Sequence, residues 1–261
     1  MTLTKFEFRC NLKSIDKNKT TDFGFKSVPY KEKKKLVKKV FDDVAEKYDL
    51  MNDISSLGLH RLWKRRAVKL MNLTRGERVL DIASGTGDMA NEISKKIGTN
   101  SFLVISDINE RMLRIGRDKL IDSGVNALAI NCNSESLPFS DSSFDKVSVA
   151  FGLRNMTDKE KALKEINRVL KVDGKLVVLE FSKVSKSFEF FYNWYLFNIL
   201  PSLGSKLVGV RESYQYLVES IQKYPPPEKI SSLMLDAGFL SARFQTMSLG
   251  IVSIHQAISG Q

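Results

Sequence analysis

The sequence predicts an α/β fold with a doubly wound, mostly parallel β-sheet. Three observations support this fold class. From Arg78 onward, short apolar runs alternate with amphipathic segments, as expected for repeated strand–helix units. Two apolar runs near the C-terminus follow each other without a helix between them, which is typical of an antiparallel strand pair. The 261 residues are 43% hydrophobic, which suffices for one large domain with a buried core.

The central part of the chain contains the predicted parallel strands and their crossover helices. We expect five strands joined by right-handed crossovers, near residues 78–82, 102–106, 127–131, 144–150 and 175–181. Helices are expected between them, near residues 87–97, 110–122 and 158–170. The last of these helices is predicted to stop at Asp173-Gly174, because glycine commonly follows a helix end.

The C-terminal part completes the sheet. An aromatic-rich segment, two helices and two strands are expected near residues 188–200, 211–222, 228–237, 241–247 and 249–258. The two helices are separated by the break Pro225-Pro226-Pro227. The final antiparallel pair brings the sheet to seven strands.

The N-terminal part is predicted to cap the sheet. Residues 1–19 are expected to form a flexible extension, and residues 20–261 a single domain. Within that domain a helical cap spans residues 20–77 and the core spans 78–261. The N-terminal residues lack the apolar segment of a secretory signal, and no transmembrane helix is predicted.

Charge and cysteine content limit the partners, the location and the metal sites that the sequence allows. The formal net charge is +11, and much of the excess lies in the N-terminal third. Such a surface attracts nucleic acid, anionic membranes or acidic partners, and a solvated helix face is the alternative. Cys10 and Cys132 are too few for a disulfide framework, and neither the cysteines nor the histidines have metal-site spacing. We therefore expect a reducing, cytoplasmic location and no metal.

A glycine turn between the first strand and its helix predicts a cofactor site. The strand ends at Asp81, and the turn that follows contains Gly85, Gly87 and Asp88. Glycines allow the sharp reversal and the close approach of a ligand to the backbone, as in Rossmann-like folds. The motif alone fits NAD and other adenosine cofactors alike. The two acids favour the cationic S-adenosylmethionine over a diphosphate, unless Asp88 only caps the helix and Asp81 only bonds the turn.

Polar residues after the next two strands strengthen the adenosine prediction. Asp107 follows the second strand, about twenty residues past the glycines, where a carboxylate accepts both ribose hydroxyls. Asn133 and Ser134 follow the third strand, where a polar group bonds the adenine edge. Ordinary polar loop residues are the alternative for this pair.

These residues resemble class I methyltransferases, and much more closely the family that C-methylates the ring of ubiquinone and menaquinone precursors. The resemblance covers about Thr20 to Gly250, and its motifs are TTDFGF (20–25), KYDLMND (47–53), GLHRLWKR (58–65), LDIASGTGD (80–88), SDIN (106–109), LPF (137–139), FGLRNMTDKEKAL (151–163), LEFSK (179–183) and SYQYLVESI (213–221). It implies a seven-stranded fold, S-adenosylmethionine as methyl donor, and cofactor contacts at Thr86, Asp107, Asn133 and Ser134. Ser84 and Ala150 depart from the family's common Gly and Ser.

The resemblance also implies a substrate and a chemistry. A reduced ring becomes nucleophilic at carbon when its hydroxyl loses a proton, so a polyprenyl quinol is the expected substrate. Arg154 and Asn155 follow the fourth strand, where Arg154 stabilises a developing phenolate. Proton removal is assigned to an ordered water or to a residue such as Tyr48. The alternatives are that Arg154 and Asn155 only fix their loop and that Tyr48 is a core aromatic.

Other readings of the sequence stay open. An RNA methyltransferase of the same fold is allowed by the charge, although no nucleic-acid module is present and no nucleic acid is expected. A NAD-linked oxidoreductase is allowed by the glycines but disfavoured by Asp81 and Asp88. Two functional roles fit the aromatic segment 188–200. It lines a slot for the isoprenoid tail, or it lies against the anionic inner face of the cytoplasmic membrane. A buried helix stripe or a homodimer contact explains it as well. Peripheral contact with other quinone-biosynthesis enzymes is a further expected partnership, and the sequence does not choose between a benzoquinol and a naphthoquinol.

Overall fold

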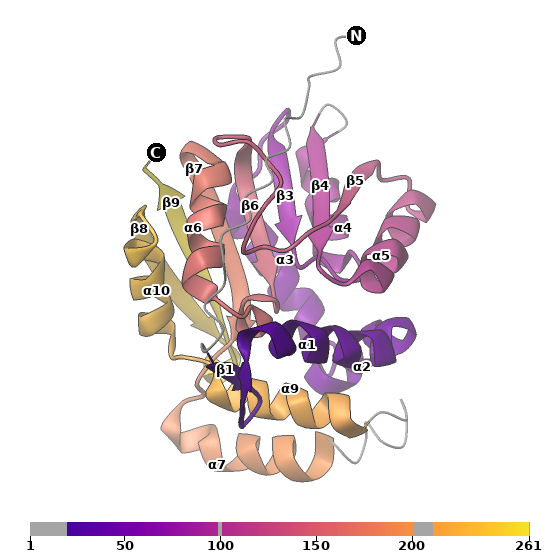
Figure 1. Ribbon diagram of the computed structural model, residues 1–261, viewed down its shortest axis with the longest axis vertical. Helices are drawn as coiled ribbons and strands as arrows, with labels where there is room; N and C mark the ends of the chain where they lie inside the picture. The colour runs from indigo at the N-terminus through magenta and orange to yellow at the C-terminus, as the bar shows by residue number, and fades with distance from the viewer. Residues whose placement is uncertain (1–19, 99–100, 201–210, 261) are drawn as a thin grey trace.

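A computed structural model describes residues 20–98, 101–200 and 211–260, so the predicted extension at residues 1–19 lies outside the described residues. Its main feature is a seven-stranded sheet in the order β5-β4-β3-β6-β7-β9-β8 (Figure 1). The strands are β3 (Arg78–Ile82), β4 (Phe102–Asp107), β5 (Ala127–Asn131), β6 (Phe144–Ala150), β7 (Leu170–Phe181), β8 (Phe239–Met247) and β9 (Val252–Ser259). The first five are parallel, and β9 and β8 pair antiparallel. The predicted fold class is confirmed.

Helices cover both faces of this sheet. One face packs against α3 (Leu59–Met71), α4 (Asp88–Ile97) and α5 (Glu110–Asp122), and the other against α6 (Lys159–Val169) and α10 (Pro227–Asp236). The central strand β3 is buried from Val79 to Ile82 because helices cover both faces of the sheet there, and Leu80 and Val147 are completely inaccessible. Loops that leave β3 and β6 toward opposite faces create a switch point between these two strands.

The predicted stop of the third crossover helix is wrong. The helix α6 ends at Val169, and β7 begins at the next residue, so Asp173 and Gly174 lie within the strand. Leu170 is fully buried and pairs with Phe144 of β6, which extends the strand back to the helix. Asp173 takes a positive φ of 58°, so the glycine signal marked a turn inside the strand.

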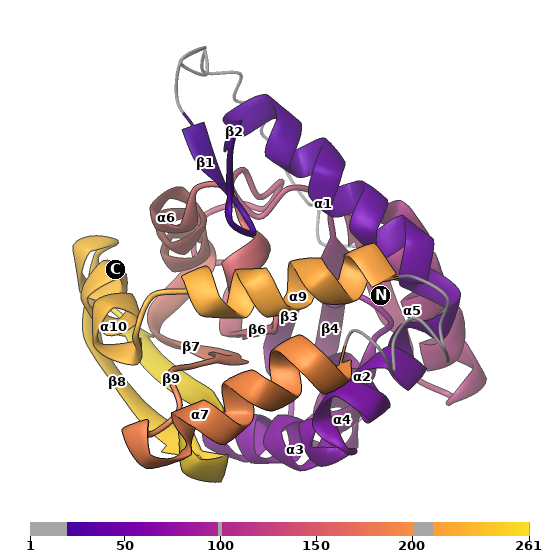
Figure 2. The same cartoon turned by 90° about the horizontal axis from the view of Figure 1, so that it is seen from below.

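The cap lies at the carboxyl ends of the parallel strands and comes from two parts of the chain (Figures 1 and 2). Its helices are α1 (Tyr30–Val44), a 3₁₀ turn (Ala45–Lys47), α2 (Tyr48–Ser56), α7 (Lys186–Trp194), a π-helical turn (Tyr195–Ile199) and α9 (Arg211–Lys223). They share an apolar core that includes Val44, Met51, Leu196 and Leu217. The helix α3, which the sequence places in the cap, instead packs Trp63 and Ala67 against the sheet, because its apolar side faces β7 and β9.

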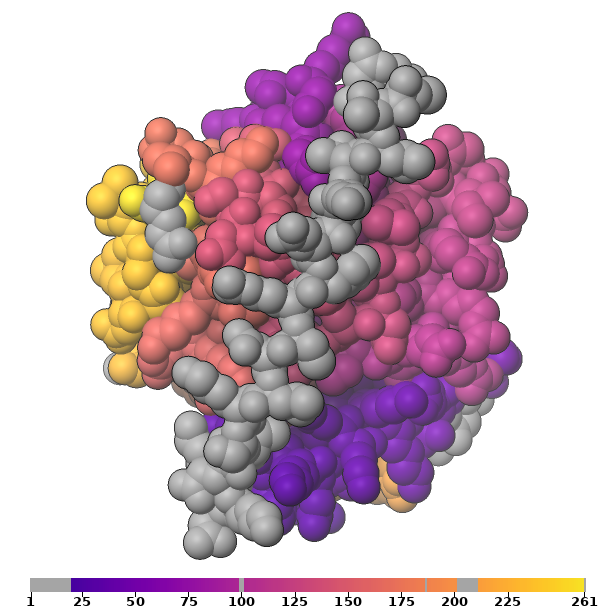
Figure 3. Space-filling model, turned by 45° about the horizontal axis from the view of Figure 1, so that its top comes forward, coloured from indigo at the N-terminus to yellow at the C-terminus, as the bar shows by residue number. Residues whose placement is uncertain are grey.

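A short hairpin precedes the cap and was not predicted. It consists of β1 (Thr20–Phe23) and β2 (Lys26–Pro29), joined by a turn in which Gly24 has a φ of +58°. The hairpin contacts α9, and a Cβ on Gly24 would lie 2.1 Å from the carboxylate of Glu219. In the space-filling view the indigo N-terminal segment lies along the edge of the core (Figure 3).

The aromatic segment is amphipathic. Tyr192, Leu196 and Leu200 are buried in the cap, as a buried stripe would be. Four other aromatic side chains on α7 and the π-helical turn are exposed, namely Phe190, Phe191, Trp194 and Phe197. Within the described ranges, no helix combines the length and the apolar character needed to cross a bilayer.

Candidate functional site

Two adjoining pockets lie at the switch point, beneath the cap. The larger one measures about 810 Å³ with its open mouth included, within the usual range for small-molecule sites. The smaller one lies beside the glycine turn. Both are lined by Tyr48 of α2, by Ala83 and Gly85 after β3, and by Ala150 and Phe151 at the end of β6. The two pockets therefore form one elongated site.

The glycine turn has the conformation that its sequence predicts. Gly85 and Gly87 have φ values of +55° and +81°, which other residues rarely adopt. Gly85 lines both pockets, whereas Gly87 lines neither and begins α4. A third glycine, Gly116 of α5, was missed: a Cβ there would lie 2.6 Å from the carbonyl oxygen of Gly85. A glycine inside a helix was the available signal for this close approach.

Asp107 lies at the centre of the larger pocket, as predicted. Its Oδ2 accepts from the Gly85 amide at 2.9 Å, and its Oδ1 accepts from the Asn109 amide at 2.8 Å. Burial raises the pKa of Asp107 above its usual value, and the amide donors offset part of that shift. Each oxygen retains a lone pair for a ligand hydroxyl. The geometry suits a carboxylate that accepts two ribose hydroxyls.

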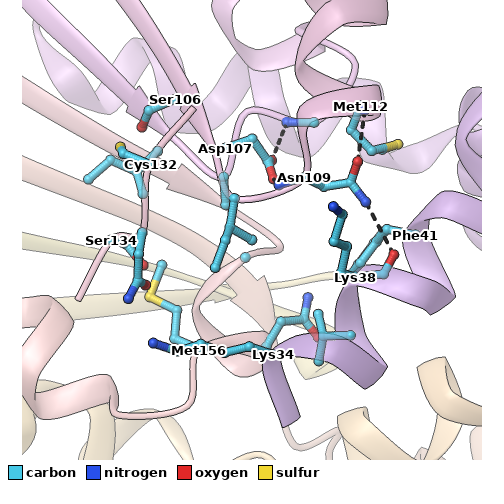
Figure 4. Close-up of a pocket in the computed structure, with 18 of the residues that line it drawn as sticks. Lys34, Lys38, Phe41, Ser106, Asp107, Asn109, Met112, Cys132, Ser134 and Met156 are labelled. Atoms are coloured by element: carbon cyan, nitrogen blue, oxygen red, sulfur yellow. Dashed lines mark hydrogen bonds between the residues drawn. The ribbon is translucent and has the colours of Figure 1, made fainter. Parts of the chain in front are cut away.

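Asn133 and Ser134 also line the larger pocket, as predicted. Figure 4 shows Ser106 and Cys132 on the sheet side, with Lys38 and Phe41 of α1 opposite them. The helix α1 is held in this position by Asn109, whose Nδ2 donates to Asp42 Oδ1 at 2.8 Å. The pocket therefore has one wall from the core and one from the cap.

The two acids at the glycine turn differ in how they are neutralised. Asp81 is inaccessible and accepts hydrogen bonds from the hydroxyls of Ser84 and Ser148, both at 2.6 Å. Burial raises the pKa of Asp81 to about 6. Asp88 forms ion pairs with Lys64 at 2.9 Å and Lys119 at 3.2 Å. Because these cations already balance Asp88, Asp81 is the acid available to a cationic ligand in the smaller pocket.

Thr86 connects the glycine turn to the cap. Its hydroxyl donates to Asp49 Oδ1 at 2.6 Å, and Asp49 Oδ2 pairs with Lys119 at 2.6 Å. Thr86 lines the smaller pocket, so it lies at the predicted cofactor site while its hydroxyl is bonded to the cap. The sequence analysis did not predict the roles of Lys64 and Lys119, because it assigned Lys64 only to the basic N-terminal surface and gave Lys119 of α5 no role.

The basic N-terminal third is only partly a surface. Lys33 is 2% exposed, and its Nζ donates to the carbonyl oxygen of Met156 at 3.3 Å. Lys34 pairs with Glu135 at 3.1 Å, and Lys64 is buried against Asp88. Lys33 and Lys34 fasten the cap to the core, whereas Lys64 joins the core helices α3 and α4, so this run of basic residues is not simply a solvated surface.

The three predicted catalytic residues come close together but differ in exposure to the site. Tyr48 and Asn155 line the larger pocket. Arg154 lines neither pocket: its Nη1 pairs with Glu180 at 2.8 Å, and both side chains are buried. The guanidinium also lies over the ring of Phe181, with 5.2 Å from its carbon to the centroid.

Tyr48 is suited to donating a hydrogen bond. Burial raises the pKa of Tyr48 to about 12, and the positive charge of Arg154 offsets part of that shift. A phenol with this pKa keeps its proton at neutral pH, so Tyr48 is a poor general base. It can instead donate to an oxyanion that develops beside it.

The residues around the two pockets fit S-adenosylmethionine. Asp107 suits the ribose, the pocket-lining side chains Asn133 and Ser134 can hydrogen-bond an adenine edge, and Asp81 suits the cationic methionine end. Gly85 separates the two ends and lets the ligand approach the backbone. In the ranges 20–98, 101–200 and 211–260, no cluster of His, Cys, Asp and Glu has the arrangement of a metal site.

Comparison with known proteins identifies the family of the chain. The chain matches the model of the ubiE/COQ5 methyltransferase family over residues 27–259. It is 49% identical over 241 residues to the ubiquinone/menaquinone biosynthesis C-methyltransferase UbiE of Hydrogenovibrio crunogenus, covering 91% of this chain and 95% of that protein. UbiE of Haemophilus ducreyi is 48% identical over 242 residues, which cover 92% of this chain and 93% of that protein. A solved SAM-dependent methyltransferase from Thermotoga maritima shares the fold, with a TM-score of 0.59, 22% identity, and coverage of 84% and 97%. This chain therefore belongs to the ubiE/COQ5 methyltransferase family.

Proposed function

We propose that this enzyme transfers a methyl group from S-adenosylmethionine to a ring carbon of a reduced polyprenyl quinone precursor. The products would be menaquinol from demethylmenaquinol, or the methylated form of 2-polyprenyl-6-methoxy-1,4-benzoquinol. The observation that carries the proposal is the similarity to C-methyltransferases of ubiquinone and menaquinone biosynthesis over nine-tenths of the chain. The paired pockets beneath a two-part cap support it, because they can hold the methyl donor and the ring together.

The chemistry asks the protein to align two reactants and to exclude water. When bound, S-adenosylmethionine supplies an electrophilic methyl group on its sulfonium. Asp107 in the larger pocket and Asp81 in the smaller one would hold the two ends of that donor, and the lining side chains Phe41 of the cap and Phe151 of the core would help to exclude water. The ring is activated when its hydroxyl loses a proton to water. The C–C bond would form as the sulfur–methyl bond breaks and S-adenosylhomocysteine leaves, and the C–H proton would then pass to solvent while the ring oxygen regains a proton, so that one proton is released overall.

Tyr48 and Asn155 are the groups that face the ring hydroxyl. Tyr48 O–H and Asn155 Nδ2–H can both donate to the oxygen as it becomes negative. Arg154 supports them from behind the pocket, where its charge is shared with Glu180. Arg154 thus contributes positive charge near the pocket, while Tyr48 and Asn155 make the direct hydrogen bonds to the ring oxygen.

A turnover assay tests the proposal. Purified protein is incubated with labelled S-adenosylmethionine and a demethylated menaquinone or benzoquinone precursor, with and without a chemical reductant. Methylated product is expected only with the reductant, because the oxidised ring has no hydroxyl to deprotonate. Absence of product with either reduced precursor would refute the proposal.

We also propose that the enzyme is cytoplasmic and takes its lipid substrate at an anionic membrane surface. The four exposed aromatic side chains of α7 and the π-helical turn form an aromatic face, with Leu57 and Leu62 exposed on the neighbouring α2–α3 elbow. The elbow and the π-helical turn are in contact, because the Tyr195 hydroxyl donates to the Ile54 carbonyl at 3.4 Å. Exposed aromatics combined with a net charge of +11 suit an interfacial site on anionic lipid.

Vesicle co-sedimentation at low salt tests the membrane proposal. A Phe190→Ser/Trp194→Ser variant is expected to bind anionic vesicles about fivefold or more weakly than the wild type. Leu240→Ser is the matched control, because Leu240 is 70% exposed on β8, away from the aromatic face. Equal binding by all three proteins, or no binding by the wild type, would refute the proposal.

A further inference from the structure

The N-terminal hairpin and one buried tyrosine have no role in the chemistry described so far. They belong to the motifs TTDFGF (20–25) and SYQYLVESI (213–221), which lie almost two hundred residues apart. In the structure they meet directly, because the rings of Phe23 and Tyr216 are stacked with centroids 4.5 Å apart and an interplanar angle of 22°. Tyr216 is 6% exposed.

The far end of Tyr216 reaches the site. Its hydroxyl donates to Asn155 Oδ1 at 3.0 Å. Burial raises the pKa of Tyr216, so the hydroxyl keeps its proton and remains a donor. The Asn155 Nδ2 group contacts the carbonyl oxygen of Phe151 at 3.4 Å, which leaves its second N–H for the pocket.

We propose that Tyr216 is a positioning residue that sets the orientation of the Asn155 amide, and that the N-terminal hairpin holds Tyr216 in place. With Oδ1 occupied by Tyr216, Asn155 presents an N–H to the ring hydroxyl. An amide without this restraint can turn over and present its carbonyl oxygen, which repels a developing phenolate. The inference rests on the proposed quinol methylation and assigns a determinant of its rate.

The hairpin is tied to its surroundings on two further sides. Thr21 Oγ1 donates to the Thr157 carbonyl at 3.4 Å, beside the loop that carries Asn155. The Phe25 amide donates to Glu219 Oε2 at 3.1 Å, on the same helix as Tyr216. The hairpin thus bridges the loop after β6 and the helix α9, which are the two elements whose side chains meet at the hydrogen bond.

The charge of the reacting group predicts which kinetic constant changes. A neutral quinol hydroxyl can donate to an amide oxygen or accept from an amide N–H, so substrate binding tolerates either orientation. The phenolate can only accept, so the transition state requires the N–H. Tyr216→Phe is therefore expected to lower kcat about tenfold, with KM for the quinol and Kd for S-adenosylmethionine within about threefold of wild type.

Tyr214→Phe is the matched control. Tyr214 lies on the same helix and is fully buried, but its hydroxyl has no hydrogen-bond partner among the described residues. The two variants lose the same atom from the same helix, so a merely structural effect would appear in both. Tyr214→Phe is expected to keep the wild-type kcat, and an equal loss in both variants would overturn the proposal.

A double-mutant cycle tests whether Tyr216 acts through Asn155. In an Asn155→Ala background, Tyr216→Phe is expected to cause no further loss of kcat. Phe23→Leu, which removes the stacked ring, is expected to lower kcat about threefold in the wild type and not at all in Tyr216→Phe. An unchanged kcat in Tyr216→Phe, or a tenfold loss that persists without Asn155, would overturn the proposal.

The side-chain amide of Asn155 gives a readout that needs no substrate. In nitrogen-15 NMR relaxation its order parameter is expected to be high in the wild type and in Tyr214→Phe, and lower in Tyr216→Phe. If the wild type methylated no quinol, the proposed function would fail, and this measurement would still decide the inference. Equal order parameters in all three proteins would refute it.

Discussion

The sheet core and the cap are attached by different forces. The strands β3, β6 and β7 are buried on both faces, and their stability comes from apolar side chains such as Leu80 and Val147. The cap has its own apolar core but is fastened to the sheet edge by polar contacts, including Thr86 with Asp49, Lys33 with Met156 and Asn109 with Asp42. We infer that the cap opens at a lower free energy than the core unfolds, which allows reactants to enter a rigid site.

The largest expected effect is on the core. Leu80→Ala removes a fully buried side chain from the centre of β3 and should lower the free energy of unfolding by about 2–5 kcal/mol. Leu128→Ala on β5 is the control. Because Leu128 is 42% exposed, this substitution should lower the free energy of unfolding by less than about 1 kcal/mol. Urea denaturation measures both. A loss below about 1 kcal/mol for Leu80→Ala would contradict the assignment of stability to the sheet.

A smaller effect concerns Asp81, the inaccessible acid that lines the smaller pocket. S-adenosylmethionine affinity should fall about tenfold between pH 7 and pH 5, because Asp81 protonates near its pKa of about 6 and loses its attraction for the cationic ligand. The effect of pH on folding stability has the opposite sign to its effect on cofactor affinity. The folded pKa lies above the unfolded one, so the stability contributed by Asp81 is present at low pH and is lost as the pH rises through 6.

Calorimetric titration across this pH range checks the prediction. Asp81→Asn should bind weakly at pH 7 and show a shallower pH dependence. The pKa of Asp107 is also raised, so Asp107→Asn serves as the parallel variant that separates the two carboxylates. An Asp81→Asn protein with the wild-type pH slope would show that another group titrates.

The smallest expected effect concerns the attachment of the cap. Asp49→Asn weakens the contact with Lys119 and should raise the dissociation rate of S-adenosylmethionine about threefold, while the free energy of unfolding changes by less than about 1 kcal/mol. Amide hydrogen exchange in α2 should accelerate. The wild type should approach the variant at high salt, because salt screens the ion pair.

The control is an exposed ion pair between two residues of the core helix α6. Glu160→Gln breaks the exposed contact with Lys164 on α6, whose atoms lie 2.6 Å apart, and should leave the dissociation rate unchanged. If Asp49→Asn lowered the free energy of unfolding as much as Leu80→Ala, the distinction between core and cap would be wrong.

The sequence predictions succeeded best for the sheet core, where local patterns determine the structure. The seven strands and the helices between them could be predicted because periodicity and turn residues are local signals. The positions of Gly85, Asp107 and Asn133 around the pocket could be predicted because the ends of parallel strands meet at one edge. The end of α6 could not be predicted, because the pairing of Leu170 with β6 overrode the local glycine signal.

The site shows the limit more clearly. Two acids in the glycine turn suggested a cationic ligand, yet lysines from α3 and α5 neutralise Asp88. The sequence also suggested Tyr48 as a base, yet burial keeps it protonated. Neither result follows from residue type, because the pKa of a side chain depends on its burial and on the charges that the fold brings near it.

The sequence alone determined the fold class, the glycine turn with its acidic partner Asp107, and the resemblance to quinone C-methyltransferases. The tertiary structure decided which side chains line the pocket: Arg154 pairs with Glu180 outside it, while Asn155 lines it and accepts a hydrogen bond from Tyr216. It also decided that α3 covers the sheet and that a hairpin from residues 20–29 packs against α9. The reason is that strands and helices follow from the pattern of residues close together in the sequence. The orientation of a polar side chain depends instead on partners that only the folded chain brings together.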